Sequence, residues 1–508
     1  MSALTRAGDG GHPATPTRAA EGSERMDTYD IVVAGNGALG LATARALTLL
    51  DARLRIAVVG PQGRPAGASP AAGAMLGCYG EVTAPLLRTA PGRAKHAKGV
   101  LAARLWPSWL EQLNGELPED ARVHVRPGTI VFSNAKSGTI EDENFIAIQQ
   151  AVKDEDEPHE LLDPNQVPGL NPAEDCRPKH ALFLPREGSV DASRLLRALS
   201  LSLEQSPKVS VVDGAVKALD VQGGRVTGVR LEDGRALAAA QVVLAMGVGT
   251  QAVLDELPEL ARRIPRIFSG GGTSLLLQVP KPALQHVVRT PNRAFACGLH
   301  GLPREGGQLY FGATNILMAR PMLHTTPADM YFLLECVLEQ IDQDLCAAQL
   351  VAWQAGNRPV TVDTCPLIGP TSVEGLWLLT GTYRDGLFLS PLLGQHLARR
   401  MCGQSGLVAE DFLPERKPIS LYTLKEARAE ALKHYLAMGW EHGIRLPKVG
   451  WHRAFPRFYQ QMLDSLYDAL GEEEFVLPPE LLAIVDSNRA AMVPFFRNYY
   501  AEVRRAWA

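Results

Sequence analysis

Three glycines near the start of the chain have the spacing of a phosphate-binding loop. Residues 29–40 read YDIVVAGNGALG, in which Gly35, Gly37 and Gly40 form the pattern GxGxxG. The apolar run 31–34 predicts a central parallel strand, and LATARALTLL after the glycines predicts a helix. In this setting the first glycine permits a tight turn, the second lets a pyrophosphate approach the backbone, and the third allows helix and strand to pack closely. The pattern predicts a dinucleotide-binding site.

An arginine in the second half of the chain is a second candidate for chemistry. Arg384 lies in LTGTYRDGLFLSP (379–391), where an Arg–Asp–Gly turn separates two apolar stretches. A lone arginine is most often an ordinary surface charge. A guanidinium group between buried segments can instead bind a carboxylate through two parallel hydrogen bonds. The rest of the chain has to decide between these interpretations.

The segment after the first predicted helix departs from a nicotinamide-binding pattern. The second predicted strand, RIAVVGP (55–61), carries Gly60 where an acidic residue would bind the adenosine ribose. This departure weakens ribose recognition and disfavours NAD. The next loop, GASPAAGAMLGCYGE (67–81), consists mostly of small residues around Met75, which lets the backbone lie against a flat ligand. A plain linker is the alternative.

Three later segments complete a family pattern. They are LFLPREGSVDASRLLRAL (182–199), the strand-rich segment 216–250, and 350–391, which combines NRP, an aspartate and PLIG with TGTYRDG. In this order they resemble the D-amino-acid oxidase superfamily of flavoproteins, in its glycine oxidase and sarcosine oxidase branch, over about residues 28–405. The resemblance implies an α/β fold: a Rossmann-like FAD-binding domain interleaved with a mixed-sheet α+β substrate domain.

The resemblance also implies a division of the chain. FAD-binding segments are expected at about 28–105, 182–255 and 350–405, and substrate-domain segments at about 106–181 and 256–349. Residues 1–27 mix charges, Gly and Pro without an apolar core, so we expect a disordered leader rather than a secretory signal.

By the same resemblance, the family's cofactor-binding positions fall on identifiable residues. They are Gly35, Gly37, Ala38, Leu39, Gly40, Ser69, Ala74, Met75, Val216, Gly247, Gly381, Tyr383, Arg384, Asp385, Gly386 and Leu387. Some sarcosine oxidases tether the flavin through a cysteine. Here Gly356 falls near that position and Cys365 lies too far along the chain, so noncovalent FAD is expected.

The catalytic and substrate-binding positions follow in the same way, with Met75 beside the flavin among them. Arg358 aligns with the family's arginine that binds the substrate carboxylate. Arg384 aligns with a family arginine that lies beside the flavin near the same pocket. A structural ion pair is the alternative for either. His300 falls on a substrate-facing tyrosine, and Asn315 on a position that is commonly apolar in the glycine enzyme. We therefore expect a pocket more polar than one built for glycine or sarcosine, with core packing as the alternative for His300.

Composition excludes several other classes of protein. The 508 residues carry a net charge of −4, with 46% hydrophobic and 21% charged residues, which is typical of a globular protein and gives no electrostatic signature for nucleic acid or an anionic membrane. No apolar run is long enough to span a bilayer. The seven cysteines form no CxxC pair and the histidines no HxxxH spacing. We therefore expect reduced thiols, a cytoplasmic location and no metal site.

Residues 406–508 lie beyond the resemblance. Within them, 420–508 hold 14 of the 32 aromatic residues and show helical periodicity in three stretches. A disordered tail would be poor in aromatic residues, so we expect a folded C-terminal helical module. Such a module can cap the active site, form a homo-oligomer face or bind a protein partner, and the sequence does not decide among these.

Together these features predict an FAD-dependent amine or amino-acid oxidoreductase. We expect an amine that carries a carboxylate to be oxidised by hydride transfer from the carbon next to nitrogen to flavin N5, which gives an imine. Oxygen would then reoxidise the flavin and yield hydrogen peroxide. One alternative is a dehydrogenase of the same fold that passes electrons to a quinone or a protein. A flavoprotein-like interaction subunit without turnover is the other.

Overall fold

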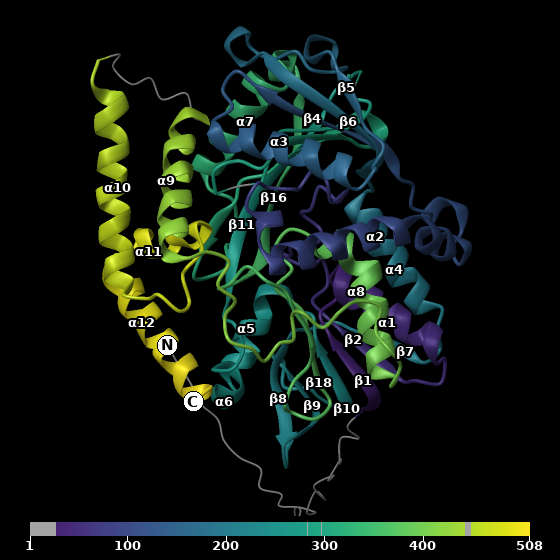
Figure 1. Ribbon diagram of the computed structural model, residues 1–508. Helices are drawn as coiled ribbons and strands as arrows, with labels where there is room; N and C mark the ends of the chain where they lie inside the picture. The colour runs from purple at the N-terminus through teal and green to yellow at the C-terminus, as the bar shows by residue number, and fades with distance from the viewer. Residues whose placement is uncertain (1–26, 282, 296, 442–448) are drawn as a thin grey trace, which may run out of the picture.

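Two β-sheets form the framework of the chain (Figure 1). The computed structural model describes residues 27–508 except 282, 296 and 442–448, so the leader expected at 1–27 lies outside the described residues apart from Asp27. The first sheet has eight strands and the second has ten within these residues. Helices pack against both sheets, and the α/β architecture expected from the sequence is confirmed.

The glycine pattern follows the central strand of the first sheet. This strand, β1 (Asp27–Ala34), runs parallel to both neighbours, β10 (Ala236–Leu244) and β2 (Ile56–Val59). Residues 31–34 are at most 1% exposed, as expected for a strand covered on both faces. The other strands of this sheet are β7 (Val209–Val212), β8 (Val216–Gln222), β9 (Arg225–Leu231), β17 (Leu367–Pro370) and β18 (Leu376–Thr380).

Helices cover the first sheet on its two faces. The larger group, which Figure 1 shows together at one side of the molecule, consists of α1 (Ala38–Leu50), α2 (Ala90–Gly115), α4 (Ala192–Glu204) and α8 (Gly386–Met401). A side chain at Gly394 of α8 would meet the backbone of Ala42 in α1 at 2.8 Å, which shows how closely these two helices pack. The other face packs against β8, β9 and two short helices, α5 (Thr250–Asp255) and α6 (Pro258–Ala261).

The second sheet is built on a long antiparallel pair, β11 (Ile267–Gln278) and β16 (Gln349–Thr361). Its pairs are antiparallel except for β4 with β12. Its other strands are β3 (Met75–Leu76), β4 (Arg126–Asn134), β5 (Glu160–Leu162), β6 (Pro178–Ser189), β12 (Val287–Arg289), β13 (His300–Pro303), β14 (Gln308–Gly312) and β15 (Ile316–Met318). Helices α3 (Thr139–Asp154) and α7 (Pro327–Gln340) pack beside this sheet.

Three strands differ from the segment boundaries expected from the sequence. β3, the end of β6 and β16 lie in segments expected to bind FAD, yet they form hydrogen bonds within the second sheet. The physical reason is that the chain crosses between the sheets at the ends of these strands, so one segment supplies residues to both. The division into domains stays a prediction, in which these three strands belong to the substrate domain.

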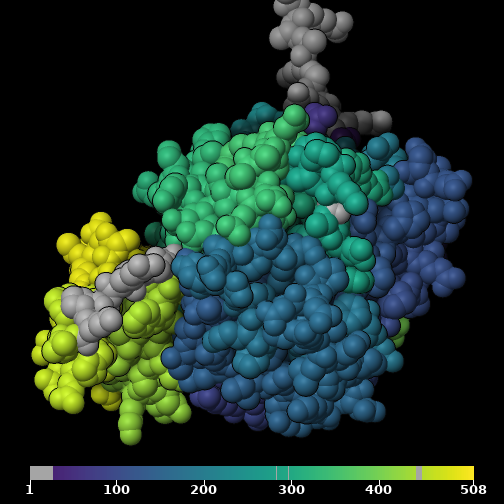
Figure 2. All heavy atoms as spheres, turned by 90° about the horizontal axis from the view of Figure 1, so that it is seen from above, coloured from purple at the N-terminus to yellow at the C-terminus, as the bar shows by residue number. Residues whose placement is uncertain are grey.

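The C-terminal helical module packs on the second sheet and lies at one side of the molecule (Figure 2). Its helices are α9 (Leu424–Glu441), α10 (Trp451–Leu470), α11 (Leu482–Ser487) and α12 (Arg489–Ala506). Phe496 of α12 is fully buried, and its ring lies 5.7 Å from that of Phe268 in β11. Leu317 and Val360 of the same sheet belong to this apolar cluster. The module therefore shares a hydrophobic core with the sheet.

Phe496→Ala is expected to lower the free energy of unfolding by about 3–5 kcal/mol, because it removes a buried ring and leaves a cavity against the sheet. Phe458→Ala is the matched control, since that ring lies in the same module and is 61% exposed. The control is expected to change the free energy by less than about 0.5 kcal/mol. Urea unfolding of the two variants measures the difference, and equal effects would contradict the shared core.

Candidate active site

The glycine loop lies at the start of α1, whose N-cap is Gly37. Gly35 has φ +118°, and a side chain there would meet the carbonyl oxygen of Ala245 at 2.2 Å. A side chain at Gly40 would meet the carbonyl oxygen of Gly35 at 1.9 Å. The backbone N–H of the first residue of α1 donates to Ser69 Oγ at 3.1 Å. The first and third glycines are thus required by backbone packing, whereas the second faces open space beside Ser69.

The absence of an acidic, ribose-binding residue at position 60 has a steric explanation. A side chain at Gly60 would lie 2.2 Å from Cγ of Asn36, so this amide fills the space. Asn36 Nδ2 donates to the carbonyl oxygen of Pro61 at 3.0 Å, and Arg64 Nε donates to the carbonyl oxygen of Asn36 at 2.7 Å. Asn36 and Arg64 both line the cavity here. Sequence reasoning missed both residues, although Asn36 stands inside the glycine pattern.

A cavity of about 430 Å³ extends from the glycine loop to the second sheet. Most of the site residues expected from the sequence line it: Gly35, Gly37, Ala38, Leu39, Ser69, Ala74, Met75, Val216, Gly247, His300, Arg358, Tyr383, Arg384, Asp385, Gly386 and Leu387. Gly40, Gly381 and Asn315 do not line it. The structure thus brings residues from seven separate segments to one place.

Arg358 extends from β16 across the neighbouring strand β11. Its Nη1 donates to the carbonyl oxygen of Thr314 at 3.1 Å and to Asn315 Oδ1 at 3.3 Å. A side chain at Gly272 of β11 would lie 2.3 Å from this Nη1, so the glycine provides the room for the guanidinium group. No ion pair joins Arg358 to an acidic side chain within the described residues. Its charge faces the cavity without a protein counter-ion.

Arg384 lies in the turn before α8, and its guanidinium carbon is 4.9 Å from the centre of the Tyr383 ring. Its Nη1 is buried and has no hydrogen-bond partner. The salt bridges of the described residues include none to Arg384. No salt bridge among the described residues therefore holds either arginine, although the carboxyl groups of Glu81 and Asp385 interact electrostatically with Arg384 over a longer distance. An unpartnered donor nitrogen in a cavity is suited to an anionic ligand.

His300 is 4% exposed and stacks on Tyr310 at 6.0 Å between ring centres. Burial lowers its pKa from 6.5 to about 4, so the ring is neutral near pH 7. Its Nδ1 lies 2.9 Å from the carbonyl oxygen of Gly298. A carbonyl oxygen only accepts, so Nδ1 carries the proton and Nε2 is an acceptor. The neutral imidazole can therefore accept a hydrogen bond at Nε2, and it lines the cavity although it is nearly fully buried.

Asn315 lies behind Arg358 instead of lining the pocket. Its Nδ2 donates to Tyr383 Oη at 2.6 Å and to the carbonyl oxygen of Phe295 at 2.9 Å, while its Oδ1 accepts from Arg358. All hydrogen-bonding atoms of the amide are therefore used by the protein. The expectation that Asn315 makes the pocket wall more polar is corrected for this reason.

Other cavity residues were missed by sequence reasoning. They include Glu81, Cys297 and Tyr310. Glu81 pairs with buried Arg289, and Tyr310 Oη donates to the carbonyl oxygen of Ala71 at 2.8 Å. Glu81 ends the small-residue loop 67–81, whereas the segments of Cys297 and Tyr310 carry no motif. The run of three glycines at 270–272 in β11 was a usable signal, because consecutive glycines in a strand indicate a close approach by another group.

The comparisons with known proteins agree with this geometry. A family model described as FAD dependent oxidoreductase (DAO) matches residues 30–400, and the chain belongs to this family. A glycine oxidase of Pseudomonas putida is 29% identical over 384 residues, which cover 74% of this chain and 96% of that protein. Solved glycine oxidase structures from Geobacillus kaustophilus and Bacillus cereus share the fold, with TM-scores of 0.65 and 0.63 at 22% and 21% identity. They cover 78% and 77% of this chain and 100% of their own.

These findings confirm the family, the fold class and the class of enzyme expected from the sequence, an FAD-dependent amine or amino-acid oxidoreductase. FAD is the cofactor. The cavity fits it, since α1 and α8 both begin at the cavity wall and helix N-termini favour phosphate and other anionic groups. The family match ends at residue 400, before the C-terminal helical module.

The described residues contain neither a metal-binding cluster nor a membrane-spanning helix. No group of three or more His, Cys, Asp or Glu side chains among them is arranged to hold a metal ion. None of their helices is both long and apolar enough to cross a membrane.

Gly40→Ala and Gly37→Ala are expected to separate packing from cofactor binding. Gly40→Ala should lower the temperature of unfolding and the yield of folded protein, because its methyl group overlaps a backbone oxygen. Gly37→Ala has its nearest atom, Ser69 Oγ, at 3.1 Å, so the fold should persist while FAD is lost more easily. Bound FAD per chain and thermal unfolding measure the two effects. Wild-type FAD content in both variants would contradict the assignment of the loop.

His300 is expected to make stability depend on pH below neutrality. Above about pH 6.5 the ring is neutral in both states, whereas between pH 6.5 and 4 the unfolded chain binds a proton that the folded chain does not. The free energy of unfolding therefore decreases as the pH falls through this window, by up to about 1.4 kcal/mol per pH unit for this group. Thermal unfolding from pH 7 to 4.5 should show a smaller decrease for His300→Gln than for wild type. Equal pH dependence would contradict the lowered pKa.

Proposed function

We propose that the substrate is a small amino acid or related amine that carries a carboxylate. The observation that supports this most directly is that Arg358 and Arg384 line one cavity with the glycine loop, and neither forms a salt bridge with an acidic side chain among the described residues. Desolvating a guanidinium group costs free energy that a bound carboxylate offsets. A relative that covers three quarters of the chain is a glycine oxidase, which agrees with a small substrate.

We propose the following positions for FAD. The loop at Gly35–Gly37, with Ser69, holds the pyrophosphate, and Val216 lies at the adenosine end. The segment Tyr383–Leu387, together with Met75, holds the flavin ring, and Gly381 shapes the turn that precedes this segment. The cavity-lining cysteine, Cys297, donates its thiol to the carbonyl oxygen of Ala313 at 3.4 Å, and residue 356 is a glycine, which supports noncovalent binding.

The residues of the chain orient the substrate. Bound FAD supplies a hydride acceptor at N5 for the carbon next to the substrate nitrogen. Arg358 binds the carboxylate with the donors that Thr314 and Asn315 leave free. His300 keeps its proton on Nδ1 and accepts a hydrogen bond from the substrate nitrogen at Nε2. Correct orientation of this kind contributes several kcal/mol to a reaction barrier.

We further propose oxygen as the final electron acceptor, with hydrogen peroxide as the product. The oxidase relatives support oxygen over a quinone or a protein acceptor. All seven cysteines are free, which supports the expected cytoplasmic location. On the basis of the sequence, we also propose that residues 406–508 bind either a second copy of the chain or a protein partner.

Arg358→Lys is expected to retain FAD and to raise KM strongly, because a point charge does not reproduce two parallel hydrogen bonds. Arg358→Ala should weaken substrate binding by ~2–5 kcal/mol. Anaerobic bleaching of the flavin absorbance by glycine, sarcosine and D-amino acids, followed by a peroxide assay in air, identifies the substrate and measures both variants. Arg177→Lys, at a side chain that is 66% exposed, is the control. Wild-type KM in both Arg358 variants would overturn the carboxylate assignment.

A further inference from the structure

The C-terminal helical module contacts a loop of the substrate side at two successive backbone donors. The N–H of Ala294 donates to Glu441 Oε1 at 3.1 Å, and the N–H of Phe295 donates to His434 Nδ1 at 2.9 Å. His434 and Glu441 both belong to α9, and seven residues are nearly two helical turns, so the two acceptors lie on one face. One face of α9 therefore satisfies two backbone groups that the loop cannot pair within itself.

Ring packing strengthens this contact. The Phe295 ring stacks on His434 with ring centres 4.7 Å apart and meets Tyr435 edge-on at 5.1 Å. Burial, and then the charge of Lys433, lowers the pKa of His434 to about 3, so the imidazole is neutral. Nδ1 accepts from a backbone N–H and is therefore the unprotonated nitrogen. His434 holds Phe295 through both its ring face and its acceptor.

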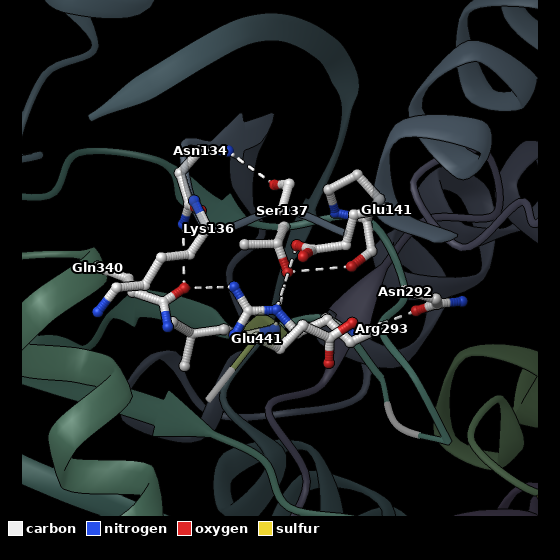
Figure 3. A network of polar contacts seen from close by, with 12 residues as sticks. Asn134, Lys136, Ser137, Glu141, Asn292, Arg293, Gln340 and Glu441 are labelled. Carbon is white, nitrogen blue, oxygen red and sulfur yellow. Dashed lines mark hydrogen bonds and ion pairs between the residues drawn. The ribbon is translucent and has the colours of Figure 1, made fainter. Parts of the chain in front are cut away.

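The same loop is also held by a buried polar network in which Glu441 of α9 lies beside Arg293 (Figure 3). Arg293 Nε lies 3.2 Å from Glu141 Oε1 of α3, and its Nη2 donates to Gln340 Oε1 of α7 at 2.5 Å. Arg293 is 8% exposed and Glu141 is fully buried. Three successive residues of the loop are therefore held, Arg293 through its side chain and Ala294 and Phe295 through their backbone N–H groups.

From Phe295 the contacts lead directly to the substrate-binding arginine. The Phe295 carbonyl accepts from Asn315 Nδ2 at 2.9 Å, and Asn315 Oδ1 accepts from Arg358 Nη1 at 3.3 Å. The second bond of the same Nδ2, to Tyr383 Oη, fixes the amide so that its oxygen faces the guanidinium group. Displacement of the Phe295 carbonyl removes one of the two bonds that orient Asn315, and it thereby weakens one of the two hydrogen bonds that hold Arg358, the other being to the Thr314 carbonyl.

We propose that His434 is a positioning residue for Arg358, and that the C-terminal helical module thereby completes the substrate side of the active site. This inference rests on the proposed function, in which Arg358 binds the substrate carboxylate. The module lies outside the family match of residues 30–400. The support for Arg358 is thus supplied by a part of the chain that the family pattern does not include.

The test compares His434→Leu with His434→Asn in the FAD-bound, full-length protein. Leucine removes the acceptor, whereas asparagine places its Oδ1 close to the position of Nδ1. His434→Leu is expected to raise KM about tenfold, which corresponds to about 1.4 kcal/mol and lies in the range for an unpaired buried donor. Its kcat and FAD content should stay within about twofold of wild type. His434→Asn should restore KM to within about twofold, a rescue that a purely structural role does not predict.

Lys433→Ala is the matched control on the same helix. Lys433 pairs with Glu143 of α3 at 2.8 Å, so this variant weakens the docking of α9 without a contact to Ala294 or Phe295. Its KM is expected to equal that of wild type. Equal increases in KM for Lys433→Ala and His434→Leu would overturn the proposal, because any weakening of the docking of α9 would then raise KM.

A double mutant separates this inference from the proposed function. Adding His434→Leu to Arg358→Ala should raise KM no further, because both changes act through one guanidinium group. Additive effects, or a wild-type KM in His434→Leu while Arg358→Ala is impaired, would overturn the inference and leave the proposed function intact. If His434→Leu does not fold, His434→Gln replaces it, since its amide oxygen lies one carbon further out. A wild-type KM in the glutamine variant then overturns the proposal in the same way.

Discussion

The positive charge of Arg358 has no acidic partner among the described residues, and this is the constraint on which the substrate side of the molecule depends. A guanidinium group removed from water costs free energy unless its donors are satisfied. The protein satisfies part of them with neutral oxygens of Thr314 and Asn315 and leaves the remainder to the cavity. Neutral partners hold the group in place without cancelling the charge that attracts an anionic substrate. The glycine at 272 is a consequence of the same constraint, because any side chain there would occupy the space of the guanidinium group.

The part of the site that the sequence predicts is the part set by local spacing. The glycine loop is one continuous stretch of the chain, and the segment 381–387 is another. Their turns and the helices that follow them can therefore be inferred from neighbouring residues. The fully buried strand before Gly35 was predictable for the same reason. The strands that cross between the sheets were harder to assign, since their hydrogen-bond partners are distant in the sequence, as with Met75 and Ser189.

Side-chain roles that depend on several distant segments could not be derived from spacing. The orientation of Asn315 is fixed by residues 295, 358 and 383, and no pattern in the sequence connects these positions. The same holds for His300, whose acceptor nitrogen follows from the carbonyl group of Gly298. The aromatic content of residues 420–508 predicted that the module folds, and the fold is confirmed. Its docking site on β11 and β16 depends on which helix faces are apolar in three dimensions, and the sequence alone left this open.

The contact between α9 and the Ala294–Phe295 loop also has a meaning for biosynthesis. Chains emerge from the ribosome with the N-terminal part first, and folding units form as they are completed. Every residue assigned to FAD or to the substrate precedes residue 388, whereas α9 begins at Leu424 and the core that holds the module includes Tyr500 and Val503. A growing chain can therefore complete its cofactor site well before the support of Arg358 is in place. A nascent enzyme of this architecture acquires its full affinity for substrate only after the module, which follows the cofactor site in the chain, has been synthesised and has packed on the sheet.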